Sequence, residues 1–333
     1  MKKLLAILLS VVITTFAFAG APSSADAGAI ISASELKALV DSKDKNLILF
    51  GVINPTTALV PLSAASRPIE GSWLIWRPDY TSGDTKEALA AEVTGYRRSQ
   101  AEMEALLSKA GVTLDSKIVV YGADAMHDPA RFVWQLKMLG LKNVQYLDGG
   151  INAWLDAGYP HGNGKRLAGE AAKTDFKAPN YNPAAFDAPF DLVKKAVTSD
   201  EWVIIDARSG DEFNGKQTNS SPGAYGTGRI AGAKHINWTS AVDGKTHLLK
   251  SVDELKAIYG DTIKGKKVIA YCQSGVRSAH TWLVLTEALG ATDVLNYDGS
   301  WIEWSFAASE ASGGKFPSME KLVEEWKDNK KPI

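Results

Sequence analysis

The sequence predicts an α/β fold organised as two domains of similar topology, and three observations support this. The chain has 333 residues, and roughly 150 residues per domain suggests two domains. Short apolar runs alternate with helical patterns, which is typical of a largely parallel sheet flanked by helices. A degenerate repeat, in which residues 117–122 match residues 267–272, divides the chain into two comparable halves.

Residues 1–19 have the pattern of a signal peptide. Lys2 and Lys3 precede an apolar run over Leu4 to Phe18, which is too short to favour a membrane span. Ala17-Phe18-Ala19 then has the small residues that signal peptidase reads. We expect cleavage after Ala19, a periplasmic or secreted protein, and no stable membrane insertion of the mature chain. An uncleaved N-terminal anchor is the alternative.

The composition is that of a globular protein. Hydrophobic residues make up 45% and charged residues 23% of the chain, and the formal net charge is -1. We expect no nucleic-acid partner, because this balance provides no basic surface. Cys272 is the only cysteine and cannot form a disulfide within its own chain. In an oxidising compartment, a lone thiol is either buried and inert or reactive.

The repeat is clearest in a block of strand, helix and strand within each half. Residues 117–122 and 267–272 are predicted to form buried strands. A helix follows each strand, over about 131–139 and 278–289, and ends at Gly140 or Gly290, as a left-handed C-cap favours. Further strands are expected over 144–147, 294–297, 47–53 and 203–208.

These elements define the domain organisation that we expect. The first domain covers residues 32–160 and the second covers residues 190–312. Residues 161–189 are rich in Gly, Ala, Lys, Asn and Pro and form the expected linker. Residues 313–333 form a C-terminal tail, in which residues 319–326 have the pattern of a short amphipathic helix.

The segment after the strand 267–272 carries the candidate nucleophile. The strand delivers Cys272 to a tight loop, and a helix starts from that loop, so the helix dipole and unpaired N–H groups would stabilise a thiolate. Gly275 lets successive N–H groups converge on one anion, and Arg277 adds a positive charge. The residues expected to bind an anionic sulfur group are Gln273, Ser274, Gly275, Val276 and Arg277.

The spacing of this loop favours sulfur chemistry over phosphate chemistry. Cys272 and Arg277 are separated by four residues, whereas cysteine phosphatases have five residues between the two. A shorter loop forms a smaller cradle, which suits one terminal sulfur atom better than a tetrahedral phosphate. A cysteine phosphatase or arsenate-type reductase stays an alternative.

The sequence resembles the tandem-domain rhodanese family, which includes thiosulfate and 3-mercaptopyruvate sulfurtransferases. The resemblance rests on Ile205-Asp-Ala-Arg208, Glu212-Phe213, Gly228-Arg-Ile-Ala-Gly-Ala233, the Cys272 loop and Asp298-Gly-Ser-Trp301. It implies two rhodanese-like domains of an exported bacterial type, each with a mainly parallel five-stranded sheet flanked by helices. It also implies that the C-terminal domain is catalytic and that the N-terminal copy is inactive.

The first half lacks the functional residues of the second. It carries Gly51, Ile53 and Gly122 at the positions of Asp206, Arg208 and Cys272. The first domain is therefore expected to be structural and to contribute one wall of a cleft between the domains.

The resemblance implies a double displacement without a metal or organic cofactor. Cys272 takes the outer sulfur of a small anionic donor such as thiosulfate, holds it as a persulfide, and passes it to cyanide or a thiol. Asp206 is expected to order the loop and Arg208 to bind the donor, with a structural ion pair as the alternative. A non-catalytic sulfur or chalcogen carrier is the second functional hypothesis, and a redox protein is a candidate partner.

Two departures from the family pattern leave the donor open. Gln273 and Ser274 stand where thiosulfate-specialised members often carry basic residues. Glu212 stands where mercaptopyruvate-specialised members tend to have a second arginine. His280 is expected to pack on its helix or face solvent, and the histidines show no metal-ligand spacing.

Overall fold

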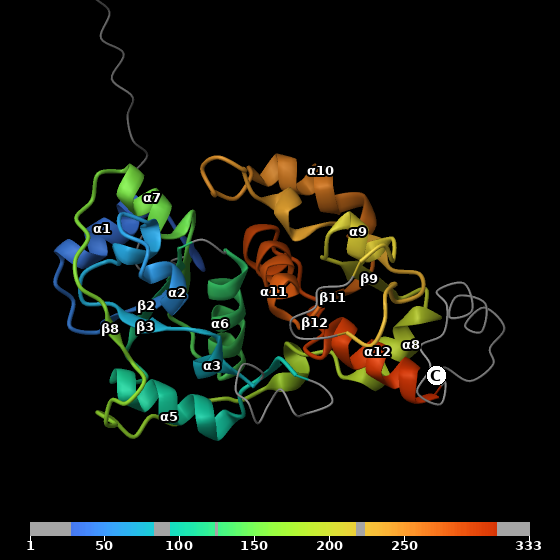
Figure 1. Ribbon diagram of the computed structural model, residues 1–333, viewed down its shortest axis with the longest axis horizontal. Helices are drawn as coiled ribbons and strands as arrows, with labels where there is room; N and C mark the ends of the chain where they lie inside the picture. Colours follow the sequence, from blue (N-terminus) through green and yellow to red (C-terminus); the bar gives the residue numbers. More distant parts are fainter. Residues whose placement is uncertain (1–27, 83–93, 124–125, 218–223, 312–333) are drawn as a thin grey trace, which may run out of the picture.

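The chain forms two α/β units that lie side by side (Figure 1), as the sequence predicts. The computed structural model describes residues 28–82, 94–123, 126–217 and 224–311. The predicted signal peptide and the predicted C-terminal tail lie outside these residues. Among the residues described, no helix is both long enough and apolar enough to cross a bilayer.

The first unit is built on a parallel sheet with the strand order β1-β7-β6-β2-β3-β8. The strands of this sheet are β1 (Ile30–Ile31), β2 (Leu47–Val52), β3 (Trp73–Ile75), β6 (Lys117–Gly122), β7 (Val144–Leu147) and β8 (Lys165–Arg166). A small antiparallel pair consists of β4 (Thr81–Ser82) and β5 (Tyr96–Arg97). The helices are α1 (Ala33–Asp41), α2 (Pro55–Ala58), η1 (Ala64–Ser66), α3 (Arg77–Tyr80), α5 (Gln100–Ala110), α6 (His127–Met138) and α7 (Gly150–Asp156).

The second unit has a smaller parallel sheet with the strand order β10-β9-β11-β12. Its strands are β9 (Trp202–Asp206), β10 (Lys234–His235), β11 (Lys267–Tyr271) and β12 (Val294–Asn296). Its helices are α8 (Phe190–Val197), α9 (Gly210–Phe213), η3 (Trp238–Ala241), α10 (Val252–Ile263), α11 (Val276–Leu283), the π-helix η4 (Val284–Ala288) and α12 (Ser300–Ala311). The short helix η2 (Pro183–Ala185) precedes this unit.

The fold class is confirmed, but the expectation of five strands in each sheet is wrong for both domains. Counted over the described residues, the first sheet has a sixth strand, β8, because residues of the expected linker pair with β3. The second sheet has four, because its counterpart of β1 is reduced to a single bridge between Asp187 and Asn296. The same linker segment also buries Leu167 and Phe176 in the core, so it packs on the first domain.

The strand register shows that the two halves are copies of one topology. Gly51 of β2 pairs with Tyr121 of β6, and Asp206 of β9 pairs with Tyr271 of β11. In both copies the tyrosine hydroxyl accepts the N–H of an isoleucine, either Ile69 or Ile230. The predicted glycine C-caps are also present, because Gly140 has φ 87° and Gly290 has φ 71°.

The two domains meet through α6 and α11, which pack against each other near the centre of the molecule (Figure 1). Two backbone contacts cross this interface in a reciprocal way. The Arg97 N–H of the first domain donates to Asp298 of the second, and the Leu249 N–H of the second donates to Asp148 of the first. The two acceptors, Asp148 and Asp298, occupy equivalent positions of the repeat, so equivalent residues of the two domains make the contacts between them.

Candidate active site

Cys272 lies at the bottom of a small cavity between the domains. It follows the last residue of β11, at the carboxyl end of the parallel sheet, where α/β folds place their sites. The cavity has a volume of about 180 Å³, and Cys272 is only 1% exposed. The lining residues are Arg77, His127, Cys272, Gln273, Ser274, Val276 and Arg277. The first domain thus supplies one wall through Arg77 and His127.

The surroundings of the thiol stabilise its anionic form. Burial by itself would raise the pKa of Cys272. The charge of Arg277, the hydroxyl and N–H of Ser278, and the N–H of Ser274 outweigh this effect and lower the pKa below its ordinary value. The Ser278 hydroxyl is buried and has no conventional hydrogen-bond partner among the described residues, so it is available to the sulfur. A thiolate is the reactive form of a cysteine.

The side chain of Ser300 stabilises the conformation of the Cys272 loop through hydrogen bonds to its backbone. Its hydroxyl accepts the N–H groups of Cys272 at 3.1 Å and Gly275 at 2.9 Å, and it donates to the carbonyl of Tyr297 at 2.7 Å. Ser300 has φ 51°, a left-handed conformation that is unfavourable for a residue with a side chain. The N–H groups of Cys272 and Gly275 are therefore engaged by this hydroxyl, and those of Ser274 and Ser278 point to the sulfur.

Gly275 permits the tight turn that begins α11. It has φ 73°, and a Cβ atom at this position would lie 2.7 Å from the Asp298 carbonyl oxygen. Its own carbonyl accepts from Arg131 at 3.1 Å and from Asn296 at 2.9 Å. Arg131 is a buried residue of the first domain and also pairs with Asp298. The first domain therefore supports the Cys272 loop directly.

Arg277 is held in place by a carboxylate. Its Nη1 and Nη2 atoms donate to the two oxygens of Glu212 at 2.7 and 2.8 Å, a bidentate ion pair. Burial would raise the pKa of Glu212, but Arg277 and the cap residue Ser209 lower it to about 2. The positive charge beside Cys272 is accordingly compensated by a fixed negative charge.

The first domain contributes a second pair of this kind. Arg77 donates to both carboxylate oxygens of Asp128, at 2.7 and 3.2 Å. Desolvation opposes ionisation of Asp128, but His127, Arg77 and Tyr80 lower its pKa. Burial lowers the pKa of His127 to about 4, so its imidazole is neutral at physiological pH.

Asp206 and Arg208 are not among the described residues that line the cavity, so no contact in the structure supports the predicted role of Arg208 in binding the donor. Both side chains are fully buried, and Asp206 accepts from the Nε and Nη2 atoms of Arg208. Arg208 also stacks on Trp301 and donates to the carbonyl of Gly228. The structural ion pair, which was the alternative interpretation, is what the structure shows. Asp206 accepts from the hydroxyl of Tyr271 and so anchors the residue before Cys272.

The sequence interpretation missed several residues that shape this site. Glu212 was noted as part of the resemblance and as a departure from a substrate pattern, but not as the partner of Arg277, and Arg77 was not considered. His127 could have been found from the repeat, because it stands 150 positions before Arg277. Ser300 belonged to a recognised motif, but only the fold shows that its hydroxyl faces the loop.

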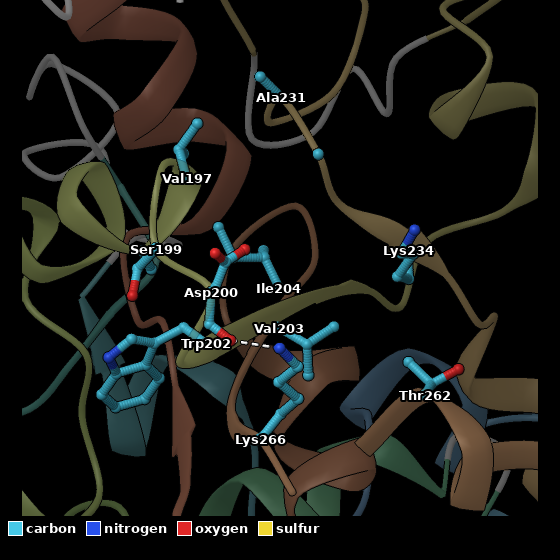
Figure 2. A pocket seen from close by; sticks show the side chains of 12 residues that line it. Val197, Ser199, Asp200, Trp202, Val203, Ile204, Ala231, Lys234, Thr262 and Lys266 are labelled. Carbon is cyan, nitrogen blue, oxygen red and sulfur yellow. Dashed lines mark hydrogen bonds between the residues drawn. The ribbon is translucent and has the colours of Figure 1, made fainter. Parts of the chain in front are cut away.

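A second hollow, of about 240 Å³, lies at the opposite end of the same sheet (Figure 2). Trp202 and Val203 of β9, Lys234 of β10 and Lys266 line it, and Lys266 donates to the carbonyl of Asp200. Its described lining residues include neither a cysteine nor a histidine. In the described part of the chain, no group of three or more His, Cys, Asp or Glu side chains could hold a metal ion.

The paired α/β domains and the thiol loop define a class of enzyme that uses an activated cysteine nucleophile. The family model for the rhodanese-like domain matches residues 32–157 and again residues 190–307. The chain therefore belongs to the rhodanese-like domain family, with two tandem copies.

Relatives and solved structures agree with this assignment. A Haloferax volcanii protein named "Putative thiosulfate sulfurtransferase" is 34% identical over 246 residues, which cover 69% of this chain and 77% of the relative. The sulfur carrier protein TtuD of Thermus thermophilus is 32% identical over 227 residues, 62% of this chain and 74% of the relative. The crystal structure of SseA from Escherichia coli, described in a study of 3-mercaptopyruvate sulfotransferases, superposes with a TM-score of 0.66 at 24% identity, covering 83% of this chain and 99% of that one.

Proposed function

We propose that this sulfurtransferase moves a sulfane sulfur from a small anionic donor of the thiosulfate kind to a thiophilic acceptor through a persulfide on Cys272. The observation that carries the proposal is the thiol itself. It lies at a helix N-terminus, its pKa is lowered, and two N–H groups and the Ser278 hydroxyl surround its sulfur. These groups are suited to stabilise a thiolate and then a persulfide anion.

The chemistry takes two displacement steps. The Cys272 thiolate attacks the outer sulfur of the donor, a sulfur–sulfur bond forms, and the donor's own sulfur–sulfur bond breaks with its electron pair leaving on sulfite. Cyanide or a thiolate then attacks the terminal sulfur of the persulfide, and the electron pair returns to Cys272. Both steps conserve charge, and neither uses a group outside the chain and its substrates.

Two measurements test the proposal. Intact mass after incubation with thiosulfate should show the gain of one sulfur atom, and subsequent cyanide should remove it as thiocyanate. The Cys272→Ser variant should show neither. Thiocyanate production by the wild type at the rate of Cys272→Ser would refute sulfur transfer from thiosulfate to cyanide.

A sulfur carrier is the second candidate, and the similarity to TtuD favours considering it. A carrier would form the persulfide but release its sulfur only to a partner protein. The enzyme assignment predicts many turnovers with cyanide, whereas a carrier would show one sulfur gained and a single turnover. Turnover of an aryl phosphate that depends on Cys272 would support the phosphatase alternative instead.

We also propose that the protein is exported, on the basis of residues 1–19. The sequence of the mature N-terminus after expression in a bacterial host tests this. A chain that begins after Ala19 in the periplasmic fraction is the expected result. A full-length chain in the cytoplasmic fraction would refute it.

A further inference from the structure

Each positively charged side chain that lines the cavity is paired with a carboxylate, and this pairing bears on how much negative charge a donor can carry. Among the described residues that line the cavity, the cations are Arg77 and Arg277, one from each domain. Arg277 forms its bidentate pair with Glu212, and Arg77 forms a similar pair with Asp128. Glu212 and Asp128 are buried, whereas the side chains of Arg277 and Arg77 are 17% and 28% exposed, so water screens each pair only in part.

The other described lining residues add no positive charge. Gln273, Ser274 and Val276 are neutral, and burial keeps His127 neutral at working pH. The charges of the two arginines and the two carboxylates therefore cancel. Once Cys272 is ionised, the net charge of these groups is negative, and each charge on an incoming donor meets net repulsion.

We propose that Glu212 and Asp128 are specificity-determining residues that make the enzyme favour sulfane-sulfur donors with a single negative charge over dianionic donors. The inference rests on the proposed function and narrows its donor class. One negative charge can be met by the N–H groups of the loop and the positive end of the α11 dipole. A second charge has no uncompensated cation among the described residues of the cavity, so a dianion such as thiosulfate is expected to react more slowly than a singly charged donor.

Thiosulfate and methanethiosulfonate are a matched pair of probes for this proposal. Both present an outer sulfur on a tetrahedral sulfur, but a methyl group replaces one charged oxygen in methanethiosulfonate. In each case Cys272 forms a bond to the outer sulfur, and the bond to the central sulfur breaks. The electron pair leaves on sulfite from thiosulfate and on methanesulfinate from the singly charged probe.

The experiment compares kcat/KM for the two donors at saturating cyanide, with thiocyanate as the product. Each value is divided by the rate constant of the same donor with a small free thiolate, which removes intrinsic reactivity. The wild type should favour methanethiosulfonate by at least tenfold on this scale. An equal value for the two donors, or a preference for thiosulfate, overturns the inference.

Charge-removing variants test whether the two carboxylates cause the preference. Glu212→Gln should shift the ratio at least tenfold toward thiosulfate, and Asp128→Asn should shift it in the same direction. Glu254→Gln is the control, because Glu254 caps α10 through Ser251 just as Glu212 caps α9 through Ser209, but only Glu212 also pairs with the cavity arginine Arg277.

The outcomes separate this inference from the proposed function. Turnover with an unshifted ratio in a folded Glu212→Gln or Asp128→Asn variant overturns the inference and leaves sulfur transfer intact. If one variant does not fold, as judged by circular dichroism, the other lies on the opposite domain and carries the same comparison. The comparison of the two donors with the wild-type enzyme tests the inference even if neither variant folds. Absence of turnover with both donors, and of any sulfur on Cys272, overturns the proposed function and this inference together.

Discussion

At the scale of single residues, the reactivity of Cys272 depends on a balance between burial and nearby positive charge. The thiol is almost completely buried, which by itself favours the neutral form. Arg277 and the hydrogen bonds from Ser278 and Ser274 reverse this preference. Removing one stabilising group should therefore have a measurable effect on the pKa of the thiol.

Arg277→Gln should raise the pKa of Cys272 and reduce sulfur transfer at neutral pH. Each unit by which the pKa rises lowers the thiolate fraction about tenfold once the pKa exceeds the working pH. The pH dependence of alkylation by iodoacetamide measures this directly. Lys256→Gln is the control, since it removes one positive charge from an exposed position of the same domain. An unchanged alkylation profile in Arg277→Gln would contradict the role of this arginine.

Ser300 combines an unfavourable backbone with a necessary side chain, and two variants separate these properties. Ser300→Ala keeps the strained φ and leaves the N–H groups of Cys272 and Gly275 without their acceptor, at a cost of about 1–3 kcal/mol for a buried group. Ser300→Gly loses the same acceptor but relieves strain of roughly 1 kcal/mol.

Both Ser300 variants should therefore lose activity, while Ser300→Gly should unfold at a higher temperature than Ser300→Ala. Thermal unfolding and the thiocyanate assay check the two parts. Full activity in either variant would show that the hydroxyl does not position the loop. Gly150, which precedes Ser300 by 150 positions, has φ 56° in the inactive copy, so a glycine is compatible with this backbone.

The site was only partly predictable from the sequence because side-chain direction is not encoded in a local pattern. The strand, turn and helix around Cys272 follow from an apolar run, a glycine and a helical pattern, all of which are local. Arg208 also follows a strand, but the sequence does not show whether its side chain pairs with Asp206 or faces the cavity. The tertiary structure decides between these, because Asp206 and the face of Trp301 hold the guanidinium.

At the scale of elements, the strands that the sequence predicted are the long and buried ones. β2, β6, β9 and β11 have apolar runs that identify them. β1, β8 and β10 have two residues each, too few for any periodicity, and their pairing depends on tertiary contacts. The strand counts could not be predicted for this reason.

The two glycines at the ends of the predicted helix after β11 allow an internal comparison. Gly275 and Gly290 have nearly equal φ values of 73° and 71°. A Cβ at Gly275 would meet the Asp298 carbonyl oxygen at 2.7 Å, whereas nothing lies within 4 Å of a Cβ at Gly290. An alanine at either site carries the backbone penalty of about 1 kcal/mol, but only one also meets a steric clash.

Gly275→Ala should abolish most activity and lower the unfolding temperature more than Gly290→Ala does. Gly290→Ala should retain nearly full activity, because its strain is far from the thiol. Thermal unfolding and the thiocyanate assay on both variants provide the comparison. Equal activities of Gly275→Ala and Gly290→Ala would mean that the Cys272 loop tolerates a displacement at Gly275.

At the scale of the whole molecule, buried histidines link the stability of the domain interface to pH. His280 of α11 is fully buried and packs near Trp238 and Tyr146, as the packing interpretation of the sequence expected. Burial and His127 lower its pKa to about 3, and burial lowers the pKa of His127 to about 4. Both folded-state values lie below the ordinary value of 6.5.

Acid should therefore destabilise the fold through these histidines. Below about pH 6.5 the histidines of the unfolded chain take up protons, whereas those of the folded chain do not. The contribution of these histidines to the free energy of unfolding is therefore fully present above that pH and falls as the pH drops toward 4 and then 3. The slope is at most about 1.4 kcal/mol per pH unit for each histidine. His280→Leu should flatten the dependence, and urea unfolding between pH 4 and 7 measures it.

The Asp187 carboxyl is among the groups whose raised pKa acts in the opposite direction in this experiment. Burial and the neighbouring Asp298 raise the pKa of Asp187 to about 7, so this carboxyl becomes destabilising as the pH rises from about 4 to 7. The difference between wild type and His280→Leu isolates the histidine, because Asp187 is present in both. An identical pH dependence in the two proteins would contradict the assignment.

The division of the cavity between two domains also bears on how such an enzyme can change over evolutionary time. The nucleophile and its loop belong to one copy of the duplication, whereas Arg77 and His127 belong to the copy without a cysteine. Substitutions in that second copy can alter which molecules enter while the groups that directly activate the sulfur stay the same. A copy without a cysteine can in this way contribute a recognition surface, so that new substrates could be acquired without rebuilding the loop around Cys272.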